Sequence, residues 1–218
     1  MQLSVWTAKA GSGATTVCLG IATRLAEQRV LLVDLSGDLP AAAGLSEPSH
    51  GVTEWLRSVE SGPDALARLE LDVARGIDLL PLGCGRRWSE RRSDLLCGVL
   101  SQDDRAVIVD LGVLDPWSTA PLDRLRMRMA SEGEHSLLVT RACYLSVRRA
   151  CRLPVSPSGV VLLQEAGRSL GHHELEAILG APVVARIDVD SAVARAIDSG
   201  LVLSRAPRLF SRQLKGVA

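Results

Sequence analysis

The stretch that decides the fold lies close to the N-terminus and reads Trp6-Thr7-Ala8-Lys9-Ala10-Gly11-Ser12-Gly13-Ala14-Thr15-Thr16. Residues 2–6 alternate and end in bulky side chains, which predicts a strand, and apolar residues recur at helical spacing across 17–25, which predicts a helix. A strand that turns through glycines into a helix is the context that a phosphate-binding loop requires. Glycine lets backbone N–H groups approach an anion, and the helix N-terminus adds unpaired donors and the positive end of its dipole. The alternative interpretation is a glycine-rich turn that binds nothing.

The loop differs from the general phosphate-binding pattern at one position. The pattern G-x-x-x-x-G-K-[ST] places a lysine before the hydroxyl residue, where this chain has Ala14. Thr15 then occupies the position whose hydroxyl would ligate Mg²⁺. The chain has only two lysines, Lys9 and Lys215, so the lysine at the front of the loop is a specific feature and not part of a lysine-rich background.

Apolar runs alternate with helical patterns along the rest of the chain. Such alternation predicts an α/β fold, a doubly wound and mostly parallel sheet with helices on both faces, and the glycine-rich loop makes this fold similar to that of P-loop NTPases. The 218 residues are expected to form a single domain, 1–218, in which the glycine- and arginine-rich residues 83–92 are mobile. Strands are predicted at 30–34, 77–81, 106–110, 136–140, 160–163 and 183–187, and helices at 52–59, 63–70, 95–100, 145–152, 174–179, 192–198 and 204–214.

Two of the predicted strands end in an aspartate, Asp34 and Asp110. Because ligands of such sheets bind at the carboxyl ends of the strands, both carboxylates and the glycine-rich loop fall at one edge. A carboxylate at this position holds Mg²⁺ or its water in P-loop proteins, and Thr15 adds a hydroxyl. The sequence therefore predicts Thr15, Asp34 and Asp110 as metal ligands. For Asp110 the alternative is an ordinary helix-capping or loop aspartate.

The composition restricts the class of partner. Lys+Arg and Asp+Glu both number 25, so the net charge gives no general attraction to nucleic acid or anionic lipid. No apolar run approaches the roughly 20 residues of a membrane span, so integral membrane association is not expected. Met1 leads directly into the first strand without room for a signal peptide, and the five cysteines include no C-x-x-C pair. We therefore expect a cytoplasmic protein with reduced cysteines.

The segment Lys9-x-Gly11-x-Gly13-x-Thr15-Thr16 resembles the deviant Walker A loop, K-G-G-x-x-G-K-T-T, of the ParA/MinD family of positioning ATPases. Further segments are similar to other motifs of that family, at 51–56, 79–83, 137–150 and 187–200, so the resemblance covers nearly the whole chain. The resemblance implies that ATP and Mg²⁺ are the cofactors. It also implies a nucleotide site made of Lys9, Gly11, Ser12, Gly13, Ala14, Thr15, Thr16, Gln164 and Asp190.

Three positions depart from the nucleotide chemistry of that family. Ala14 replaces the phosphate lysine, Ser36 replaces the second acid of the D-x-D strand end, and Gln164-Glu165 replaces the asparagine and arginine that read the base. Because a serine cannot act as a carboxylate base, the nearest acid, Asp38, is the candidate for orienting the attacking water, with Lys9 as the second catalytic candidate. The sequence therefore predicts weak ATP binding and slow or absent hydrolysis.

The resemblance implies a nucleotide-responsive or nucleotide-degenerate positioning protein that forms a homodimer through its phosphate-loop face, with Lys9 reaching the phosphates of the partner. The segment 33–42 and the altered phosphate loop look most like the CpaE/TadZ group, which places pilus and secretion machinery. The expected partner is therefore a protein of a localised assembly. Two alternatives stay open: an active DNA-partition ATPase of the ParA type, and an ATP-dependent ligase of the same superfamily.

Arginine clusters bear on the DNA alternative, because surface arginines of ParA-like proteins contact DNA phosphates. Solvated helix faces balanced by nearby acids explain such clusters at least as well when the net charge is zero. The basic C-terminal tail, 205–215, can lie on a membrane or dock onto the domain, and docking is the expectation. The clusters are Arg86, Arg87, Arg91 and Arg92; Arg124, Arg126 and Arg128; and Arg148, Arg149 and Arg152.

Overall fold

The computed structural model describes residues 1–205, 213–214 and 216–217, so most of the predicted helix 204–214 lies outside the described residues. In the described part, eight strands form one sheet in the order β3-β4-β2-β5-β1-β6-β7-β8, and all neighbouring pairs are parallel except β3 with β4. The predicted α/β fold with a mostly parallel sheet is confirmed. The strands are β1 (Gln2–Thr7), β2 (Val30–Asp34), β3 (Leu71–Ala74), β4 (Ile77–Leu80), β5 (Ala106–Val113), β6 (His135–Arg141), β7 (Gly159–Gln164) and β8 (Val183–Asp188).

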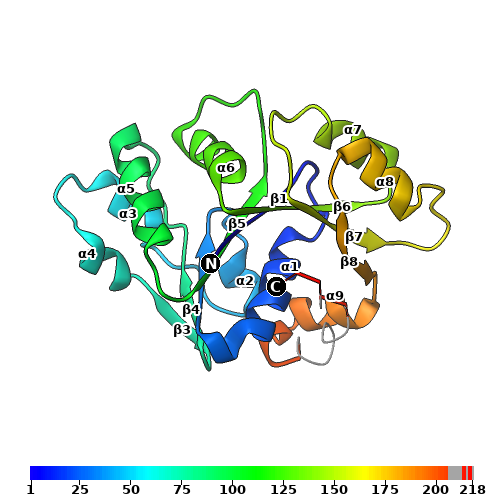
Figure 1. Ribbon diagram of the computed structural model, residues 1–218. Coiled ribbons are helices and arrows are strands. Elements are labelled where there is room, and N and C mark those ends of the chain that lie inside the picture. Colours follow the sequence, from blue (N-terminus) through cyan, green and yellow to red (C-terminus); the bar gives the residue numbers. More distant parts are fainter. Residues whose placement is uncertain (206–212, 215, 218) are drawn as a thin grey trace.

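Helices cover both faces of the sheet (Figure 1). On one face, α1, α2 and α9 pack against alternate strand residues such as Val30 and Leu32. On the other face, α3 to α6 pack against Leu31 and Val33, so β2 is buried on both sides, as its continuous apolar run requires. The helices are α1 (Ala14–Leu25), η1 (Ala26–Gln28), α2 (Leu39–Ala42), α3 (Val52–Arg57), α4 (Pro63–Ala67), α5 (Glu90–Ser101), α6 (Pro121–Glu132), α7 (Tyr144–Ala150), α8 (His172–Leu179) and α9 (Ser191–Asp198).

Some elements differ from the sequence prediction. The short helix α2, the edge strand β3 and the helix α6 are present although no pattern predicted them. Helix α5 begins at Glu90, so the prediction that 83–92 is a mobile stretch is wrong for its last residues. Arg92 is buried, its guanidinium lies 3.9 Å from the ring centroid of Trp55, and its Nη2 donates to Trp55 O at 2.8 Å. This arginine therefore ties α5 to α3 and is not available to a surface cluster.

Strand β5 continues past Asp110 to Val113, so the prediction that Asp110 ends its strand is wrong. A bulge explains the extension: Val5 pairs with Asp110, whereas the next residue, Trp6, pairs with Gly112. On the other side of β5, Asp34 pairs with Asp110. The two carboxylates therefore lie at the same level of neighbouring strands.

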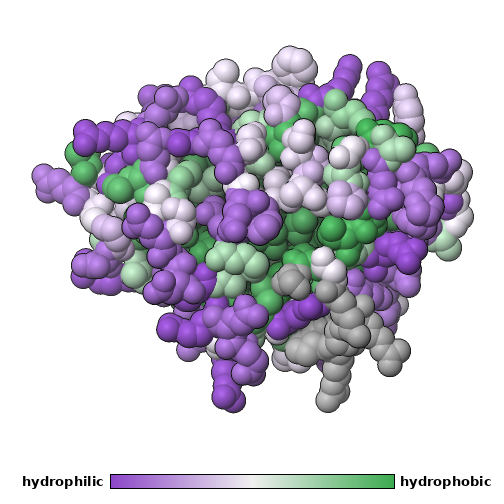
Figure 2. Space-filling model, viewed as in Figure 1, coloured by the Kyte–Doolittle hydropathy of each residue, from purple (hydrophilic) through white to green (hydrophobic). Residues whose placement is uncertain are grey.

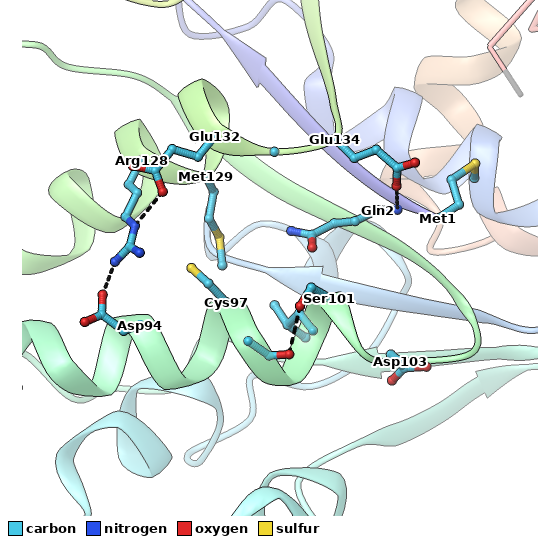
Figure 3. Close-up of a pocket in the computed structure, with 13 residues that line it drawn as sticks. Met1, Gln2, Asp94, Cys97, Ser101, Asp103, Arg128, Met129, Glu132 and Glu134 are labelled. Carbon is cyan, nitrogen blue, oxygen red and sulfur yellow. Dashed lines mark hydrogen bonds and ion pairs between the residues drawn. The ribbon is translucent and has the colours of Figure 1, made fainter.

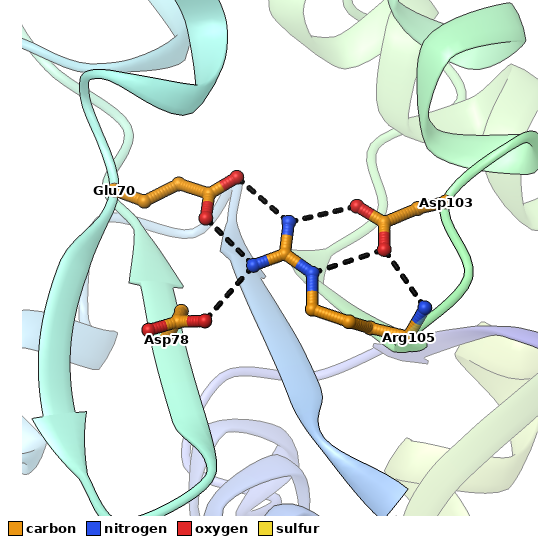
Figure 4. A network of polar contacts seen from close by, with 4 residues as sticks. All are labelled: Glu70, Asp78, Asp103 and Arg105. Atoms are coloured by element: carbon orange, nitrogen blue, oxygen red, sulfur yellow. Dashed lines mark hydrogen bonds and ion pairs between the residues drawn. The ribbon is translucent and has the colours of Figure 1, made fainter.

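At the opposite edge of the sheet, Arg105 joins three acidic side chains (Figure 4). Its terminal nitrogens donate to Glu70 at 2.7 and 2.8 Å and to Asp78 at 2.9 Å, and it is also paired with Asp103 at 2.8 Å. These residues come from the segment before β3, from β4 and from the turn before β5. The cluster therefore holds the β3–β4 hairpin against the rest of the sheet.

The surface has an uneven distribution of polarity. Figure 2 shows that hydrophilic side chains dominate the margin of the face viewed, while apolar side chains gather towards its middle. Within the described ranges, no helix has both the length and the apolar character needed to cross a membrane.

Candidate functional site

The glycine-rich loop joins the carboxyl end of β1 to the N-terminus of α1, as the sequence predicts. Gly13 has a φ of 85°, in the left-handed region that favours glycine, and a Cβ there would lie 2.9 Å from Leu163 Cδ2. Ser12 Oγ donates to Lys9 O at 2.7 Å, and Thr7 Oγ1 donates to the same oxygen at 3.1 Å. Because no side chain of the described residues caps α1, its first backbone N–H groups are available to an anion.

A cavity of about 360 Å³, here called the front cavity, opens on the β5 side of this loop. Ser36 and Asp38 line it from the segment after β2, Gly112 from β5, and Arg126 from α6. Gly112 has a φ of 63°, and a Cβ on it would lie 2.9 Å from Ser36 Cβ, so glycine is needed for the two segments to approach this closely. The loop itself contributes Thr7, Ala10, Gly11, Ser12, Gly13, Ala14 and Thr15.

Two fully buried carboxylates, Asp34 and Asp110, contact Ser36 beside the front cavity. Ser36 Oγ lies 3.0 Å from Asp34 Oδ1 and 3.0 Å from Asp110 Oδ2, but its single proton serves only one of them at a time. Asp34 Oδ1 also accepts from the backbone N–H groups of Ser36 and Gly37, at 2.9 and 2.8 Å. Asp34 Oδ2, in contrast, is buried without a hydrogen-bond partner in the described structure.

Burial controls the charge of this pair. It raises the pKa of Asp34 to about 6, although hydrogen bonds from Gly37 and Ser36 lower it, and the charge of Asp110 adds to the rise. Burial also raises the pKa of Asp110, against hydrogen bonds led by that of Thr15. A buried carboxylate with an unpartnered oxygen, as in Asp34, requires a proton or a cation.

The predicted metal ligands Thr15, Asp34 and Asp110 are thus brought together, and they offer oxygen donors only. Mg²⁺ prefers oxygen donors, and protein sites commonly supply one or two carboxylates while water and phosphate oxygens complete the shell. The unpartnered Asp34 Oδ2 gives this pair a free acceptor for such an ion. The residues present therefore fit Mg²⁺.

A second cavity, of about 300 Å³, lies on the other side of the loop and is here called the side cavity. Thr16 and Asp190 line it, and Asp190 caps α9 by accepting from Ala192 N at 2.7 Å. A concave and mostly apolar wall of this kind suits a planar ring. Among the described residues, Gly11 and Gly13 alone line both cavities. The apolar wall of the side cavity consists of Val17, Leu163, Ile187, Val189, Val193, Ala194 and Ile197.

The structure does not bring Gln164, a predicted nucleotide-binding residue, to either cavity. Its backbone oxygen accepts from Val189 N at 3.0 Å. The neighbouring Glu165 forms ion pairs with Arg141 and Arg168. Arg141 lines the side cavity, so the charge of Glu165, which replaces a base-reading residue of the resembling family, is neutralised beside that cavity.

Lys9 and Asp38, the two predicted catalytic residues, are placed differently. Asp38 is exposed and lines the front cavity, whereas Lys9 is half-buried at the front of the loop and lines neither cavity. Within one chain, the site therefore includes Asp38 but not Lys9.

Sequence reasoning missed Gly112 and Arg126 as cavity residues. Arg126 stood in an arginine cluster that was interpreted as surface, yet its side chain is only 14% exposed. Its neighbours in that cluster are more exposed, at 54% for the side chain of Arg124 and 37% for that of Arg128, and they pair with Glu90 and Glu132 respectively. The sequence spacing does not distinguish Arg126 from these neighbours, because its contact with the segment after β2 depends on the order of the strands.

A larger cavity, of about 480 Å³, lies at the amino ends of the strands (Figure 3). Its one basic side chain in the described structure, Arg128, is paired with Asp94 and Glu132. The remaining polar lining includes the acids Asp103 and Glu134. Because ligands of parallel sheets bind at the carboxyl ends, we take the loop edge as the candidate site.

No protein-family model and no curated protein matches this sequence. Solved structures match the whole fold. The ParA family ATPase of Chlorobium tepidum TLS superposes with a TM-score of 0.69 at 22% identity, over 98% of this chain and 96% of that one. The septum site-determining protein MinD of Pyrococcus horikoshii OT3, complexed with Mg-ADP, gives 0.71 at 17% identity over 100% and 93%. The MinC:MinD cell division complex of Aquifex aeolicus gives 0.72 at 16% identity over 97% and 96%. The chain has the fold of these proteins.

Proposed function

We propose that this protein binds ATP together with Mg²⁺ at the edge of the sheet where β1 and β2 end. The observation that carries the proposal is the pair of cavities on the two sides of one loop, which share Gly11 and Gly13. The apolar side cavity suits a purine ring, and the polar front cavity at the N-terminus of α1 suits a phosphate chain. The MinD protein of the same fold has been solved with Mg-ADP, which supports this choice of ligand.

The residues of the loop edge have separate roles in this proposal. Thr15, Asp34 and Asp110 hold Mg²⁺, which supplies positive charge to the phosphate oxygens when it is bound. The backbone N–H groups from Gly11 to Thr16 receive the phosphates, and Asp190 lies at the base. Asp38 lines the front cavity and is the acid that orients water, because Ser36 is not a carboxylate and its hydroxyl lies against the two buried aspartates.

ATP binding and hydrolysis are both proposed to be weak. Ala14, at the first position of α1, is only 5% exposed and brings a methyl group where related loops carry the phosphate lysine. A neutral residue there removes the charge that stabilises both the bound phosphates and the transferring phosphoryl group.

For the biological role, we propose a cytoplasmic positioning protein that acts as a homodimer and recruits a protein of a localised assembly, of the pilus or secretion kind. Lys9 lies outside both cavities of its own chain, which supports a role across a dimer interface. A fluorescent fusion should therefore occupy a fixed cellular site and become diffuse when Asp110 is replaced by alanine. A native fusion that is diffuse throughout the cell contradicts this role.

Titration calorimetry with ATP and ADP, each with and without Mg²⁺, tests the ligand. We expect Mg²⁺-dependent binding that Thr15→Ala weakens, because the hydroxyl of Thr15 faces Asp110. Thr23→Ala is the matched control: it removes the same hydroxyl from α1, where Thr23 Oγ1 donates only to the backbone oxygens of Leu19 and Gly20. The absence of binding at millimolar nucleotide, with the protein folded, would rule out the proposed ligand.

A further inference from the structure

The front cavity lacks the usual lysine but does not lack positive charge. Ala14 is neutral and Lys9 lies outside the cavity. Of the described residues that line it, Arg126 is the only basic one, and it comes from α6, far from the loop in sequence. Asp38 is the only acid of this lining. A phosphate chain in the front cavity therefore has one cationic side chain available within the same chain.

Arg126 is held in place by the segment that carries the metal carboxylates. Its Nε donates to Leu35 O at 2.7 Å, its Nη2 donates to the same oxygen, and its Nη1 pairs with Asp123 Oδ1 at 2.8 Å. Leu35 stands between Asp34 and Ser36 in the chain. The guanidinium is thus positioned before any ligand arrives, which lowers the ordering cost of a new contact.

The bonding of Arg126 leaves capacity for an anion. A guanidinium has five N–H donors. The contacts with Leu35 and Asp123 use one N–H on each of the three nitrogens, so each terminal nitrogen retains a second N–H. Two N–H groups in a fixed plane are what a bidentate contact with phosphate requires, and arginine keeps its charge at every ordinary pH.

The position of Arg126 indicates which phosphate it meets. The side cavity lies towards β7 and β8, whereas Arg126 lies on the opposite side of the loop, against the segment after β2. With the base in the side cavity, the phosphate chain extends away from β8 towards β5 and β2. Its terminal phosphate therefore approaches Arg126.

We propose that Arg126 supplies, within the same chain, the charge on the terminal phosphate that Ala14 cannot supply. This inference rests on the proposed ATP site and adds to it a residue that discriminates ATP from ADP. Asp123 competes with the phosphate for the same guanidinium, so the ion pair of Arg126 with Asp123 weakens when ATP is bound.

The test compares the dissociation constants of Mg-ATP and Mg-ADP by titration calorimetry. Arg126→Gln removes the charge while its amide can still donate to Leu35 O; we expect roughly 10- to 100-fold weaker ATP binding and little change for ADP. Arg124→Gln is the matched control, because Arg124 lies on the same helix, is 54% exposed, pairs with Glu90 and does not line the front cavity. It should leave both constants unchanged.

Two further variants test the charge in other ways. Asp123→Asn removes the competing acid and should tighten ATP more than ADP. Ala14→Lys combined with Arg126→Gln should restore ATP binding, because a charge returns from the loop. The double variant keeps the inference testable even where Arg126→Gln lowers the unfolding temperature, which is measured for every variant.

The outcomes separate this inference from the proposed function. If native protein binds neither nucleotide, the proposed ATP site is wrong, and the role of Arg126 falls with it. If native protein binds ATP and Arg126→Gln binds it equally well, the role of Arg126 is wrong while the ATP site stands. Equal losses for ATP and ADP, without rescue by Ala14→Lys, assign Arg126 to holding Leu35 only and overturn the inference.

Discussion

Replacing Asp34 by asparagine should stabilise the nucleotide-free protein at neutral pH. Asp34 is fully buried, and burial raises its pKa from 3.8 to about 6, so the ionised carboxylate costs folding free energy at pH 7. This difference in pKa corresponds to a loss of about 3 kcal/mol in the free energy of unfolding. Asparagine keeps an oxygen for the N–H groups of Ser36 and Gly37, but it places an amide nitrogen where Asp34 Oδ2 has no partner. Leaving that amide group unpartnered costs about 1–3 kcal/mol, so the expected net stabilisation is about 0–2 kcal/mol.

The pH dependence gives the sign of the effect. A carboxyl group whose pKa is higher in the folded than in the unfolded state lowers the free energy of unfolding once the pH exceeds the unfolded-state pKa. This loss of stability grows with pH until the pH passes the folded-state pKa. For Asp34 this means a gain of about 1 kcal/mol on going from about pH 7.5 to about pH 5. In a protein of this size that gain raises the unfolding temperature by about 2–4 °C. The Asp34→Asn variant lacks this contribution.

Urea and thermal unfolding of both proteins at the two pH values, with EDTA present, measure the difference. Asp38→Asn is the control, because Asp38 is an exposed carboxylate in the next turn of the chain. Without ligand, the native protein should be more stable at about pH 5 than at about pH 7.5. This gain should disappear once Mg²⁺ and ATP are added, because the metal requires the ionised carboxylate of Asp34. The reasoning fails if Asp34→Asn destabilises the protein at neutral pH, or if its stability varies with pH as that of the native protein does.

Four further predictions follow from named residues. Ala14→Lys should tighten ATP binding about tenfold or more by calorimetry, because it returns a charge to the phosphates; sub-micromolar binding by the native protein would contradict the premise. Steady-state ATP turnover should be slow or undetectable, and an ordinary ATPase rate that Asp110→Ala abolishes would overturn this. Lys9→Ala should weaken ATP-dependent self-association in sedimentation without lowering the unfolding temperature, and a native protein that stays monomeric in every nucleotide state excludes the dimer. Arg105→Met should lower the free energy of unfolding by about 1–3 kcal/mol in urea, because it leaves Glu70, Asp78 and Asp103 close together without their cation; an unchanged midpoint would show that this cluster is not stabilising.

Local pattern was sufficient for the fold class because strands buried on both faces exclude polar residues over their whole length. The run from Val30 to Val33 illustrates this, since its residues face the two apolar clusters in turn. The same logic failed for α6, where the buried Leu125, Met129 and Ala130 alternate with arginines that hide the helical period. It also failed for β3, whose residues are exposed or half-buried at the edge of the sheet and follow no apolar alternation.

The proximity of Asp34 and Asp110 was predictable for a topological reason. Carboxyl ends of neighbouring parallel strands meet at one edge, so Asp34 and Asp110 had to lie near the loop once the fold was recognised. The bulge that carries β5 past Asp110 left no sequence signal of its own, apart from Gly112. Gln164 lines neither cavity, because a position next to the base in a resembling motif does not specify which way the side chain turns.

The sequence by itself determined the elements whose signals are local: the strand-loop-helix of residues 2–25, the alternation of strands and helices, and the residue types of the candidate metal site. Only the tertiary structure decided which charges share a cavity. Arg126 and Leu35 are 91 positions apart, and they meet because β5 is inserted between β1 and β2 and carries the chain on into α6. Contacts of that kind depend on strand order and helix placement, and no single stretch of sequence indicates either of them.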